Sequence, residues 1–395
     1  MSRLPFILFV LLILVLAGWF PSSVEQASAV DDPPKKDVPA KEDPTGFAGR
    51  TGAGKARLLK EFGGSEASEE AVMLGLAWLT QMQKKDGSWV YDGALPRETS
   101  AATGMALLAF LGAGQSHKAG RYQQTVQAGL DWLIKDVEMN GPKQGKFRGT
   151  ANPQGSIYDQ GIATLALCEA YGLTQDKTLL PATQAAIDYI QNAQAANGSW
   201  GYHFGTPGDT SIVGWQIQAL HAASLSQDIK VDKKVIAKAI GFLNITGAGD
   251  LKSMYGYTNN KAGLSEPVGP ATNLTAIGLL LRYYIDGWRS NNPGFAEGVK
   301  GLMTRAPSPQ TKPVFDMYYY YYATQVVRFY GGEEWRRGTK DRRQLMAREK
   351  VECRTGSSLF RIGHPPIVGV GLPRLEKMAG LVGIAVGWEP PPCVF

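Results

Sequence analysis

The chain has 395 residues, of which 44% are hydrophobic and 19% are charged, so it can bury a large core and is too apolar for an intrinsically disordered protein. Its formal net charge of +6 comes mainly from residues 336–350, where seven Lys and Arg stand against two acidic residues. Such a run is usually a solvated helix face, and no basic stripe lies elsewhere. The sequence therefore gives no indication of nucleic-acid binding.

The first 29 residues have the three parts of a secretory signal. A basic start at Arg3 is followed by an apolar run over residues 6–20 and a polar stretch that ends in Ala27-Ser28-Ala29. We predict cleavage after Ala29 and export to the periplasm or the extracellular space. The alternative is an uncleaved anchor, because the run of fifteen apolar residues is short for a bilayer span of about 20. Such an anchor would be the chain's only contact with a membrane.

Three further segments follow from composition. Residues 30–55 contain Asp, Lys, Pro and Gly with almost no large apolar side chain, which predicts a disordered linker. Residues 56–350 are predicted to form one repeat domain. Residues 351–395 carry seven Gly and six Pro without a helical period, so this atypical tail is either a folded extension or the product of a shifted reading frame.

An internal repeat organises the domain. Residues 71–89 and 185–200 share an aromatic residue, a Gln five positions later, a Gly-Ser pair, and a Trp eleven positions after the aromatic residue. The matching residues are Trp78, Gln83, Gly87 and Trp89 in the first copy, and Tyr189, Gln194, Gly198 and Trp200 in the second. Four matches at identical offsets indicate a repeated structural unit.

Apolar spacing predicts paired helices throughout this domain. The first helix of each pair is amphipathic and the second is almost wholly apolar, which favours an outer and an inner ring. The class predicted is all-α, an α/α toroid of about five to six helix pairs whose closing pair is missing or replaced at the C-terminus. After a short helix over 56–62, the predicted pairs are 69–83 with 99–111, 122–137 with 156–171, 181–194 with 210–225, 233–244 with 271–285, and 294–304 with 315–330.

The Q-x-x-x-G-S-W motif that begins at Gln83 and at Gln194 resembles the repeat of squalene-hopene cyclases. The wider group contains terpenoid cyclases and protein prenyltransferase β subunits, and the resemblance covers residues 69–332. In weaker copies, Gly145-Lys146-Phe147 and Tyr255-Gly256-Tyr257 take the Gly-aromatic place. The resemblance implies an α/α toroid in which Gln ties a helix end to the next loop and Trp stacks over it. A Gln amide can donate to the unpaired carbonyls of a helix end.

Three acids are candidate catalytic residues because a toroid gathers the starts of its inner helices around one mouth. Glu98 and Asp209 each precede Thr-Ser at the start of a predicted inner helix, and Asp159 lies near the start of another. They are either helix caps, or one is a general acid whose pKa is raised in an apolar pocket. Both hypotheses stay open at this point.

Aromatic residues near the same helix starts are candidates for lining a cavity. These are Trp215, Tyr158, Tyr202 and Phe204. Such rings can stabilise a cation or stack on a sugar, and the alternative is core packing.

Three function classes are compatible with these features. The main hypothesis is an exported protein whose cavity binds an apolar or isoprenoid-type ligand, without evident catalysis and without a cofactor or metal. It rests on the absence of the family's D-x-D-D and D-D-x-x-D motifs and of a zinc triad, since Asp31-Asp32 in the linker is the only adjacent Asp pair. One alternative is an isoprenoid cyclase or transferase that uses a candidate acid. Another is a polysaccharide-active α/α barrel, which requires two facing carboxylates in a groove.

Overall fold

The computed structural model describes residues 47–91, 99–149, 156–261, 267–306 and 317–338, all of which belong to one compact unit. The predicted signal, most of the linker, Glu98 and the tail lie outside the described residues. Within the described ranges no helix is both long and apolar enough to cross a membrane.

The described chain is almost entirely helical, with one two-stranded ribbon. In the ribbon β1 (Gly247–Ala248) and β2 (Met254–Tyr255) are antiparallel, and Gly247 lies opposite Tyr255. The helices are η1 (Ala48–Arg50), α2 (Gly52–Phe62), α3 (Glu66–Met82), α4 (Thr99–Gly112), α5 (Gln123–Asp136), α6 (Ser156–Thr174), η2 (Lys177–Leu179), α7 (Leu180–Asn192), α8 (Thr210–Ser224), α9 (Lys233–Thr246), α10 (Asn273–Ile285), α11 (Pro293–Leu302), η3 (Met303–Arg305) and α12 (Met317–Tyr330).

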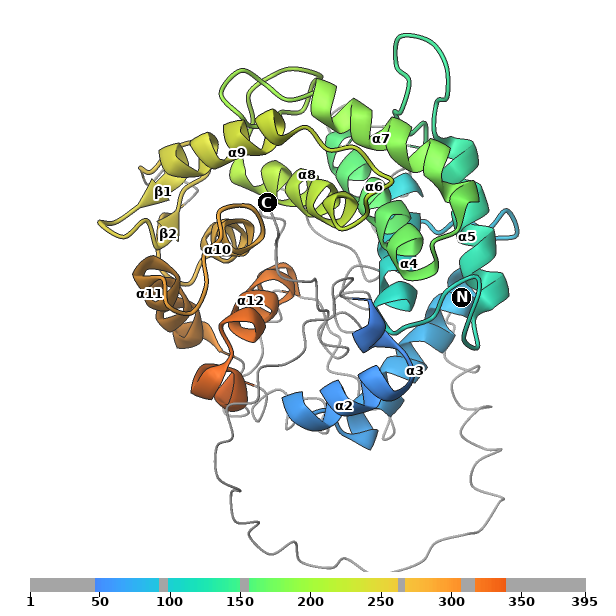
Figure 1. Cartoon of the computed structure of the whole chain (residues 1–395), viewed down its shortest axis with the longest axis horizontal. Helices are drawn as coiled ribbons and strands as arrows, with labels where there is room; N and C mark the ends of the chain where they lie inside the picture. The colour runs from blue at the N-terminus through green and yellow to red at the C-terminus, as the bar shows by residue number, and fades with distance from the viewer. Residues whose placement is uncertain (1–46, 92–98, 150–155, 262–266, 307–316, 339–395) are drawn as a thin grey trace, which may run out of the picture. The chain divides into compact units, whose positions relative to one another are not determined.

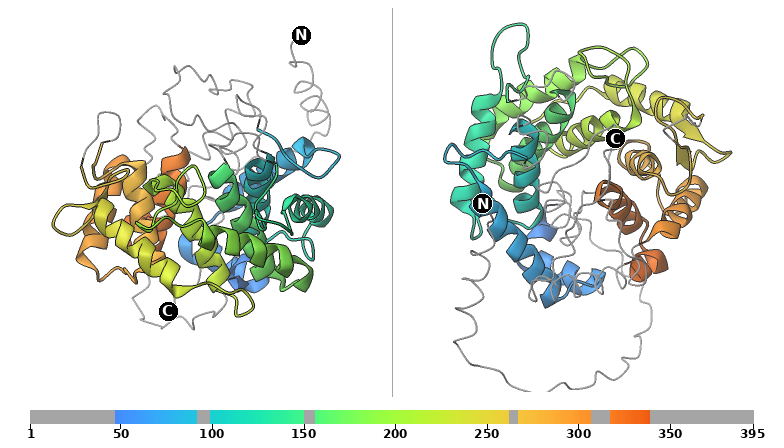
Figure 2. Two further views of the ribbon diagram at one scale, coloured as in Figure 1. Left: turned by 90° about the horizontal axis from the view of Figure 1, so that it is seen from above. Right: turned by 180° about the vertical axis from the view of Figure 1, so that it is seen from behind.

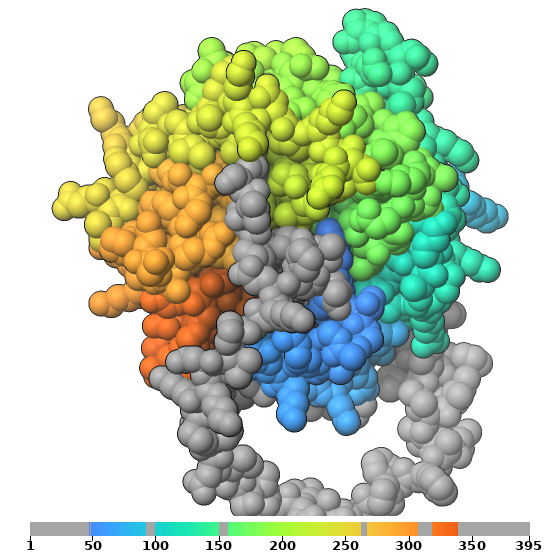
Figure 3. Space-filling view, in the orientation of Figure 1, coloured from blue at the N-terminus to red at the C-terminus, as the bar shows by residue number. Residues whose placement is uncertain are grey.

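These helices form a double ring. The inner helices α4, α6, α8, α10 and α12 contact one another in chain order. Each outer helix from α5 to α11 packs against the two inner helices that flank it in sequence (Figures 1 and 2). In the space-filling view the outer helices make a continuous rim from teal to orange (Figure 3). The prediction of an all-α toroid is confirmed.

Burial separates the two rings as the hydrophobic pattern predicts. The inner helices α4, α8 and α10 bury nearly every residue, whereas the outer helices α5 and α9 bury one face. Small residues let the inner helices approach closely. A Cβ added at Gly104 of α4 would lie 3.0 Å from Ala163 Cα of α6, and one at Gly214 of α8 would lie 2.9 Å from Ile277 Cγ2 of α10.

The Gln of the repeat ties three elements together. Nε2 of Gln83 donates to the carbonyl oxygens of Gly87 in its own loop and Thr125 in the first turn of α5, both at 2.9 Å. Gln194 makes the same two bonds, at 3.1 Å to its own loop and 2.8 Å to the first turn of α9. The Gln therefore joins the end of one outer helix both to its own loop and to the start of the next outer helix.

The aromatic residue that follows the outer helix of each repeat copy is buried at an equivalent position. Nε1 of Trp89 donates to Leu79 O and Nε1 of Trp200 to Ile190 O, each at 2.7 Å. Phe147 and Tyr255 take this place in the weaker copies, and both are buried. The backbone N–H of Trp89, Phe147 and Tyr255 each donates to an inner-helix side chain, namely Thr103, Gln160 and Thr275. The weaker copies keep the backbone geometry after losing the indole.

The predicted linker ends earlier than residue 55. Phe47 and Arg50 are buried, and α2 begins at Gly52. Composition alone could not indicate this, because the two anchoring side chains are surrounded by linker-like residues. At the other end of the described chain, Nε1 of Trp335 donates to Phe62 O at 3.3 Å, and the Arg328 guanidinium lies 3.2 Å from the centre of the Phe62 ring. The end of α2 thus meets the residues that follow α12.

Candidate functional site

The starts of α6 and α8 lie side by side and carry a linked set of polar side chains. Tyr158, the third residue of α6, shares a hydrogen bond of 2.8 Å with Oγ of Ser211 on α8. In the adjoining loops, the hydroxyls of Tyr202 and Tyr257 lie 3.1 Å apart. Asp209 lies between these two pairs. We call Tyr158, Tyr202, Asp209, Ser211 and Tyr257 the tyrosine–acid cluster.

Asp209 is both a helix cap and a buried acid. Its Oδ1 accepts hydrogen bonds from the N–H groups of Ser211 at 2.9 Å and Ile212 at 3.2 Å, and from the Ser211 hydroxyl. The residue is only 1% exposed. Burial raises the pKa of Asp209, and hydrogen bonds from Ser211 and Tyr257 partly offset this effect. Asp209 therefore caps α8 and has a raised pKa at the same time.

The tyrosines around Asp209 hold their protons firmly. Burial, followed by the charge of Asp209, raises the pKa of Tyr158 well above its usual range. Burial, followed by the hydrogen bond with Tyr202 and the charge of Asp209, does the same for Tyr257. Both phenols are therefore neutral hydrogen-bond donors at physiological pH. Sequence reasoning named Tyr257 only as part of a weak repeat copy, because its approach to Asp209 depends on loop geometry.

The repeated acid-Thr-Ser pattern has a structural basis as well. The N–H of Thr210 donates to Tyr257 O, and the N–H of Thr99 donates to Gly149 O, both at 2.9 Å. Each contact pins the start of an inner helix to the loop that precedes a later inner helix. Oγ of Ser100 donates to Oδ2 of Asp136 at 2.7 Å. The acid-Thr-Ser pattern thus marks a contact between the start of one inner helix and a later loop. Any reactivity of Asp209 comes from its burial and its neighbouring hydroxyls, not from the pattern itself.

Of the other two candidate acids, the structure describes Asp159 but not Glu98. Asp159 is 1% exposed in the first turn of α6, where the helix dipole favours a negative charge. It follows Tyr158 and so lies at the same end of the ring as Asp209. Glu98 is outside the described residues.

The aromatic candidates divide into two groups. Trp215 is 3% exposed and stacks on Tyr321 of α12, with ring centroids 5.4 Å apart, while Tyr322 meets it edge-on at 5.8 Å. Tyr158 and Tyr202 belong to the cluster, with ring centroids 6.2 Å apart. The prediction for Phe204 was wrong: it is 56% exposed, and its ring packs on Tyr189 of the outer helix α7. The loop over residues 201–209 turns Phe204 outward, which helix periodicity cannot indicate.

Sequence reasoning missed two buried titratable residues of the inner helices. Glu169 on α6 pairs with Arg50 at 2.6 Å, and His221 on α8 stacks on Tyr284 at 4.3 Å. Their signal was a charged or titratable residue inside a nearly all-apolar helix, since such residues are rarely buried without a partner. Among the described residues no group of three or more His, Cys, Asp or Glu is placed to hold a metal ion.

The fold and the cluster together define an α/α toroid. A buried acid and tyrosine hydroxyls lie where its inner helices begin. Residues 68–240 match the model of a family described as a domain of unknown function, DUF6288. No curated protein sequence matches the chain.

Solved structures with the same fold include enzymes of different chemistry. An inactive variant of the α-1,6-mannanase of Salegentibacter sp. HEL1_6, in complex with α-1,6-mannotetrose, has a TM-score of 0.55 and 9% identity over 81% of this chain and 98% of that one. A type II terpene cyclase from Scytonema has a TM-score of 0.52 and 12% identity, over 82% and 98%. The cellobiose 2-epimerase from Spirochaeta thermophila has 0.51 and 11%, over 81% and 95%.

At these identities the likeness concerns the fold alone. The toroid that the repeat motif implied is confirmed. Terpenoid cyclases are not favoured over the carbohydrate-active toroids, so the narrower resemblance to that family is not specifically supported.

Proposed function

We propose that this protein binds and processes a saccharide chain at the tyrosine–acid cluster. The observation that carries the proposal is a buried carboxyl group with a raised pKa, Asp209, placed between the hydroxyls of Ser211 and Tyr257 and close to Tyr158. A ligand rich in hydroxyls satisfies such groups, and aromatic rings give it flat surfaces to lie on. A hydrocarbon chain would leave the same polar groups unpaired.

Three further points support a saccharide over an apolar ligand. The mannanase and the epimerase that share the fold are described by their action on sugars. The predicted secretory signal would bring the protein to where polysaccharides are found. The motifs that ionise or protonate isoprenoids are absent from the sequence. The polysaccharide-active hypothesis therefore replaces the isoprenoid-binding one as the first choice.

In the proposed chemistry Asp209 is the general acid. Because its pKa is raised, it holds a proton at higher pH than an exposed Asp and can deliver it to a glycosidic oxygen. Hydrolysis needs a second carboxylate on the other side of the bond. Asp159, from the neighbouring inner helix, is a described acid at the same end of the ring and is our candidate for this role. The mannanase variant was inactivated at two adjacent aspartates, whereas here the two acids come from different helices.

A second candidate function is retained for one observation. Trp215, Tyr321 and Tyr322 form a buried aromatic wall between α8 and α12. Such a wall could stabilise a carbocation of an isoprenoid substrate, with Asp209 as the acid. The type II terpene cyclase with the same fold is the corresponding precedent.

The test combines binding and turnover measurements on the wild type and three variants. We expect calorimetry with α-1,6-mannotriose, cellotriose and laminaritriose to detect binding of at least one, and the matching polysaccharide to release reducing ends. Asp209→Asn should abolish turnover with little change in melting temperature, because Asn caps a helix as well as Asp does. Tyr257→Phe should weaken binding roughly 10-fold, for the loss of one hydrogen bond to a charged or polar group.

Asp176→Asn, at the opposite end of the ring, serves as the control and should leave both readouts unchanged. Binding of geranylgeraniol without binding of any of the saccharides would move the assignment to the second candidate. Retained turnover in Asp209→Asn would remove Asp209 from the chemistry.

A further inference from the structure

Residues 47–50 lie on the inner side of the ring, at the end opposite the tyrosine–acid cluster. They form the darkest blue segment, next to α4 in two opposite views (Figures 1 and 2). Their contacts are with Gly114, just after α4, and with the last turns of α6. From Tyr158 to Gly172 the rise along α6 is about 20 Å, at 1.5 Å per residue.

The ring of Phe47 packs directly on the backbone of Gly172, where any larger residue would clash with it. Its side chain is 6% exposed, and a Cβ added at Gly172 would lie 2.1 Å from its Cζ. The backbone of the segment is seated in a similar way, since a Cβ at Gly114 would lie 2.1 Å from the carbonyl oxygen of Arg50. A glycine of α6 and one just after α4 thus shape the surface under these residues.

Arg50 supplies the polar anchor. Its Nη1 lies 2.6 Å from Oε2 of Glu169, and the two side chains are 4% and 3% exposed. Glu169 and Gly172 are three residues apart on α6 and therefore share a helix face. Glu169 and Gly172 therefore form one continuous surface of α6, against which residues 47–50 pack.

The segment continues into a helix that lies on the surface. The helix that follows it, α2, buries none of its residues. A buried ion pair gives little net stabilisation because both ions lose their hydration. A segment with few buried apolar side chains opens at lower free energy than the core does. These features favour opening of residues 47–50 at a lower free energy than unfolding of the ring.

We propose that residues 47–50 are a strap that closes this end of the ring and undocks as a unit from the folded toroid. Docked, the strap covers Glu169 and Gly172 of α6. Undocked, it exposes the Glu169 carboxylate and opens access to the neighbouring Cys168 thiol. This device is independent of the saccharide proposal, because it concerns the other end of the ring.

Cys168 reports on the strap. It is 1% exposed and lies one helical turn before Gly172 on the same face. In the full chain with Cys353→Ser and Cys393→Ser, the rate of reaction with 5,5′-dithiobis(2-nitrobenzoate) measures access to this face. We expect Arg50→Gln to raise the rate at least 10-fold, with almost no dependence on urea, since undocking exposes far less surface than unfolding. Glu169→Gln should raise it similarly, and the double variant should raise it no further, because both changes break one contact.

Lys55→Gln is the matched control. It removes a partly buried ion pair with Glu69, 2.8 Å long, and a 3.4 Å hydrogen bond to Ala113 O, but keeps the Phe47 and Arg50 contacts, so it should leave the rate within twofold. Hydrogen exchange of residues 47–51 should accelerate in Arg50→Gln and not in Lys55→Gln. Two results would overturn the proposal: Cys168 as protected in Arg50→Gln as in the parent, or labelling in Arg50→Gln with the steep urea dependence of global unfolding. The latter would make the segment part of the cooperative core.

Discussion

At the scale of single residues, the repeat Gln shows how one side chain can define a fold. Its amide reaches a loop carbonyl and the next outer helix at once, so the length of each helix and the path of each loop are fixed together. A Glu would lose the donor, and a Leu would remove both hydrogen bonds. This explains why the Gln persists in the two well-preserved copies.

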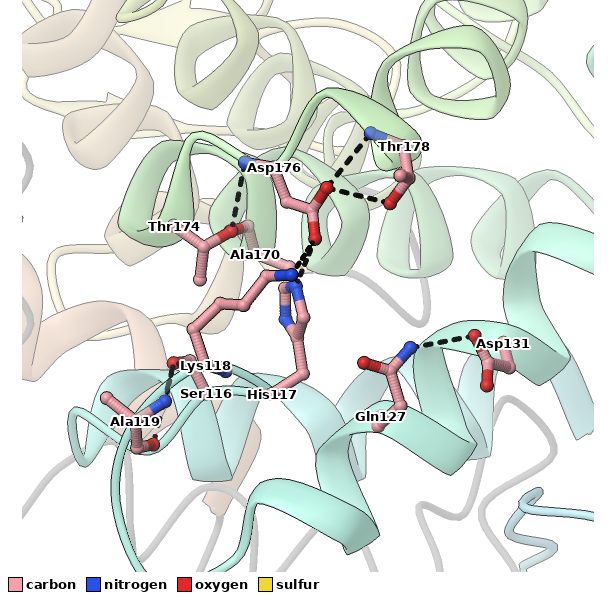
Figure 4. Close-up of polar contacts among 10 residues, drawn as sticks. All are labelled: Ser116, His117, Lys118, Ala119, Gln127, Asp131, Ala170, Thr174, Asp176 and Thr178. Carbon is pink, nitrogen blue, oxygen red and sulfur yellow. Dashed lines mark hydrogen bonds and ion pairs between the residues drawn. The ribbon is translucent and has the colours of Figure 1, made fainter.

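Replacing the repeat Gln should therefore destabilise the domain although no apolar core residue is touched. We expect Gln194→Leu to lower the free energy of unfolding by about 1–3 kcal/mol, since it leaves the carbonyls of Gly198 and Val235 without this donor. Urea denaturation measures the change. Gln127→Leu is the control, because that amide binds only Asp131 on the surface of α5 (Figure 4), and it should cost less than about 0.5 kcal/mol. Equal effects of the two changes would contradict the role of the repeat Gln.

At the scale of elements, the loops after the outer helices are shaped by glycines that press on the next outer helix. Gly87, Gly145 and Gly198 all have φ near +90°, and an added Cβ would lie 2.3, 1.9 and 2.0 Å from a carbonyl oxygen of α5, α7 and α9, respectively. The sequence indicated Gly145 as a weak repeat copy, and the structure gives the reason: the close approach survives where Gln and Trp do not.

A pair of glycines in one loop separates backbone strain from this close approach. Gly141 and Gly145 have φ of +87° and +88°, but a Cβ at Gly141 would meet nothing within 4 Å. We expect Gly141→Ala to cost about 1 kcal/mol for the left-handed conformation alone. Gly145→Ala should cost more than about 3 kcal/mol, because α7 must also move. Thermal unfolding of both variants tests this, and equal losses would show that the contact with Ala185 is not tight.

Loops at the other end of the inner helices are joined by charge. Oδ2 of Asp176, after α6, receives His117 Nε2 at 2.9 Å and Lys118 Nζ at 2.6 Å from the loop after α4 (Figure 4). Its Oδ1 accepts from the N–H and the hydroxyl of Thr178. Lys177 then pairs with Asp228 from the loop after α8 at 2.7 Å. The loops after α4, α6 and α8 are thus linked in chain order.

Asp176 should make the free energy of unfolding of the toroid fall at low pH. Its partners Lys118 and His117 hold the pKa of Asp176 well below its usual range. A depressed carboxyl pKa contributes stability above the unfolded value of about 3.9, and this contribution is lost as the pH falls below it. We expect Asp176→Asn to lower the free energy of unfolding by about 1–2 kcal/mol at pH 7, and by less at pH 3, where the unfolded chain already binds the proton that folded Asp176 still releases.

The control for this prediction is Asp228→Asn. The Lys177–Asp228 pair is solvent-exposed, with side chains 63% and 40% accessible, and Asn can still accept the hydrogen bond from Tyr171, so the change should cost less than Asp176→Asn at pH 7. Chemical denaturation at the two pH values measures both variants. A loss for Asp176→Asn that is as large at pH 3 as at pH 7 would mean that packing, and not charge, links these loops.

At the scale of the whole molecule, the ring could be predicted because apolar residues recur at helical spacing along the sequence. The contrast between amphipathic and all-apolar helices placed every predicted helix within a few residues of its observed bounds. The site was predictable only in part. Asp209 and Trp215 stand out on a helix pattern, whereas Tyr257 meets Asp209 through a loop. Glu169 depends on Arg50, more than a hundred residues earlier in a linker-like segment, and no local pattern could pair them.

The balance of buried titratable groups should set how the whole toroid responds to pH. Burial, with a smaller effect of Arg289, lowers the pKa of His221 to about 3. The unfolded chain binds this proton near pH 6.5, so His221 favours folding above that pH and the advantage is lost as the pH falls toward 3. Burial raises the pKa of Asp209 and Asp136, which has the opposite effect: their folded forms are favoured in acid and lose that advantage as the pH rises.

His221→Phe isolates the histidine term because it keeps a ring to stack on Tyr284 and removes the titration. At about 1.36 kcal/mol per pKa unit, the unfolding free energy of the wild type should fall by about 2 kcal/mol more than that of the variant between pH 7.5 and 5. Asp209→Asn should shift the slope in the other direction over the acidic half of this range, since it removes a group that favours folding in acid. Urea denaturation across the range measures all three proteins. Parallel curves for the wild type and His221→Phe would mean that His221 is protonated in the folded ring, with a partner that stabilises its charge.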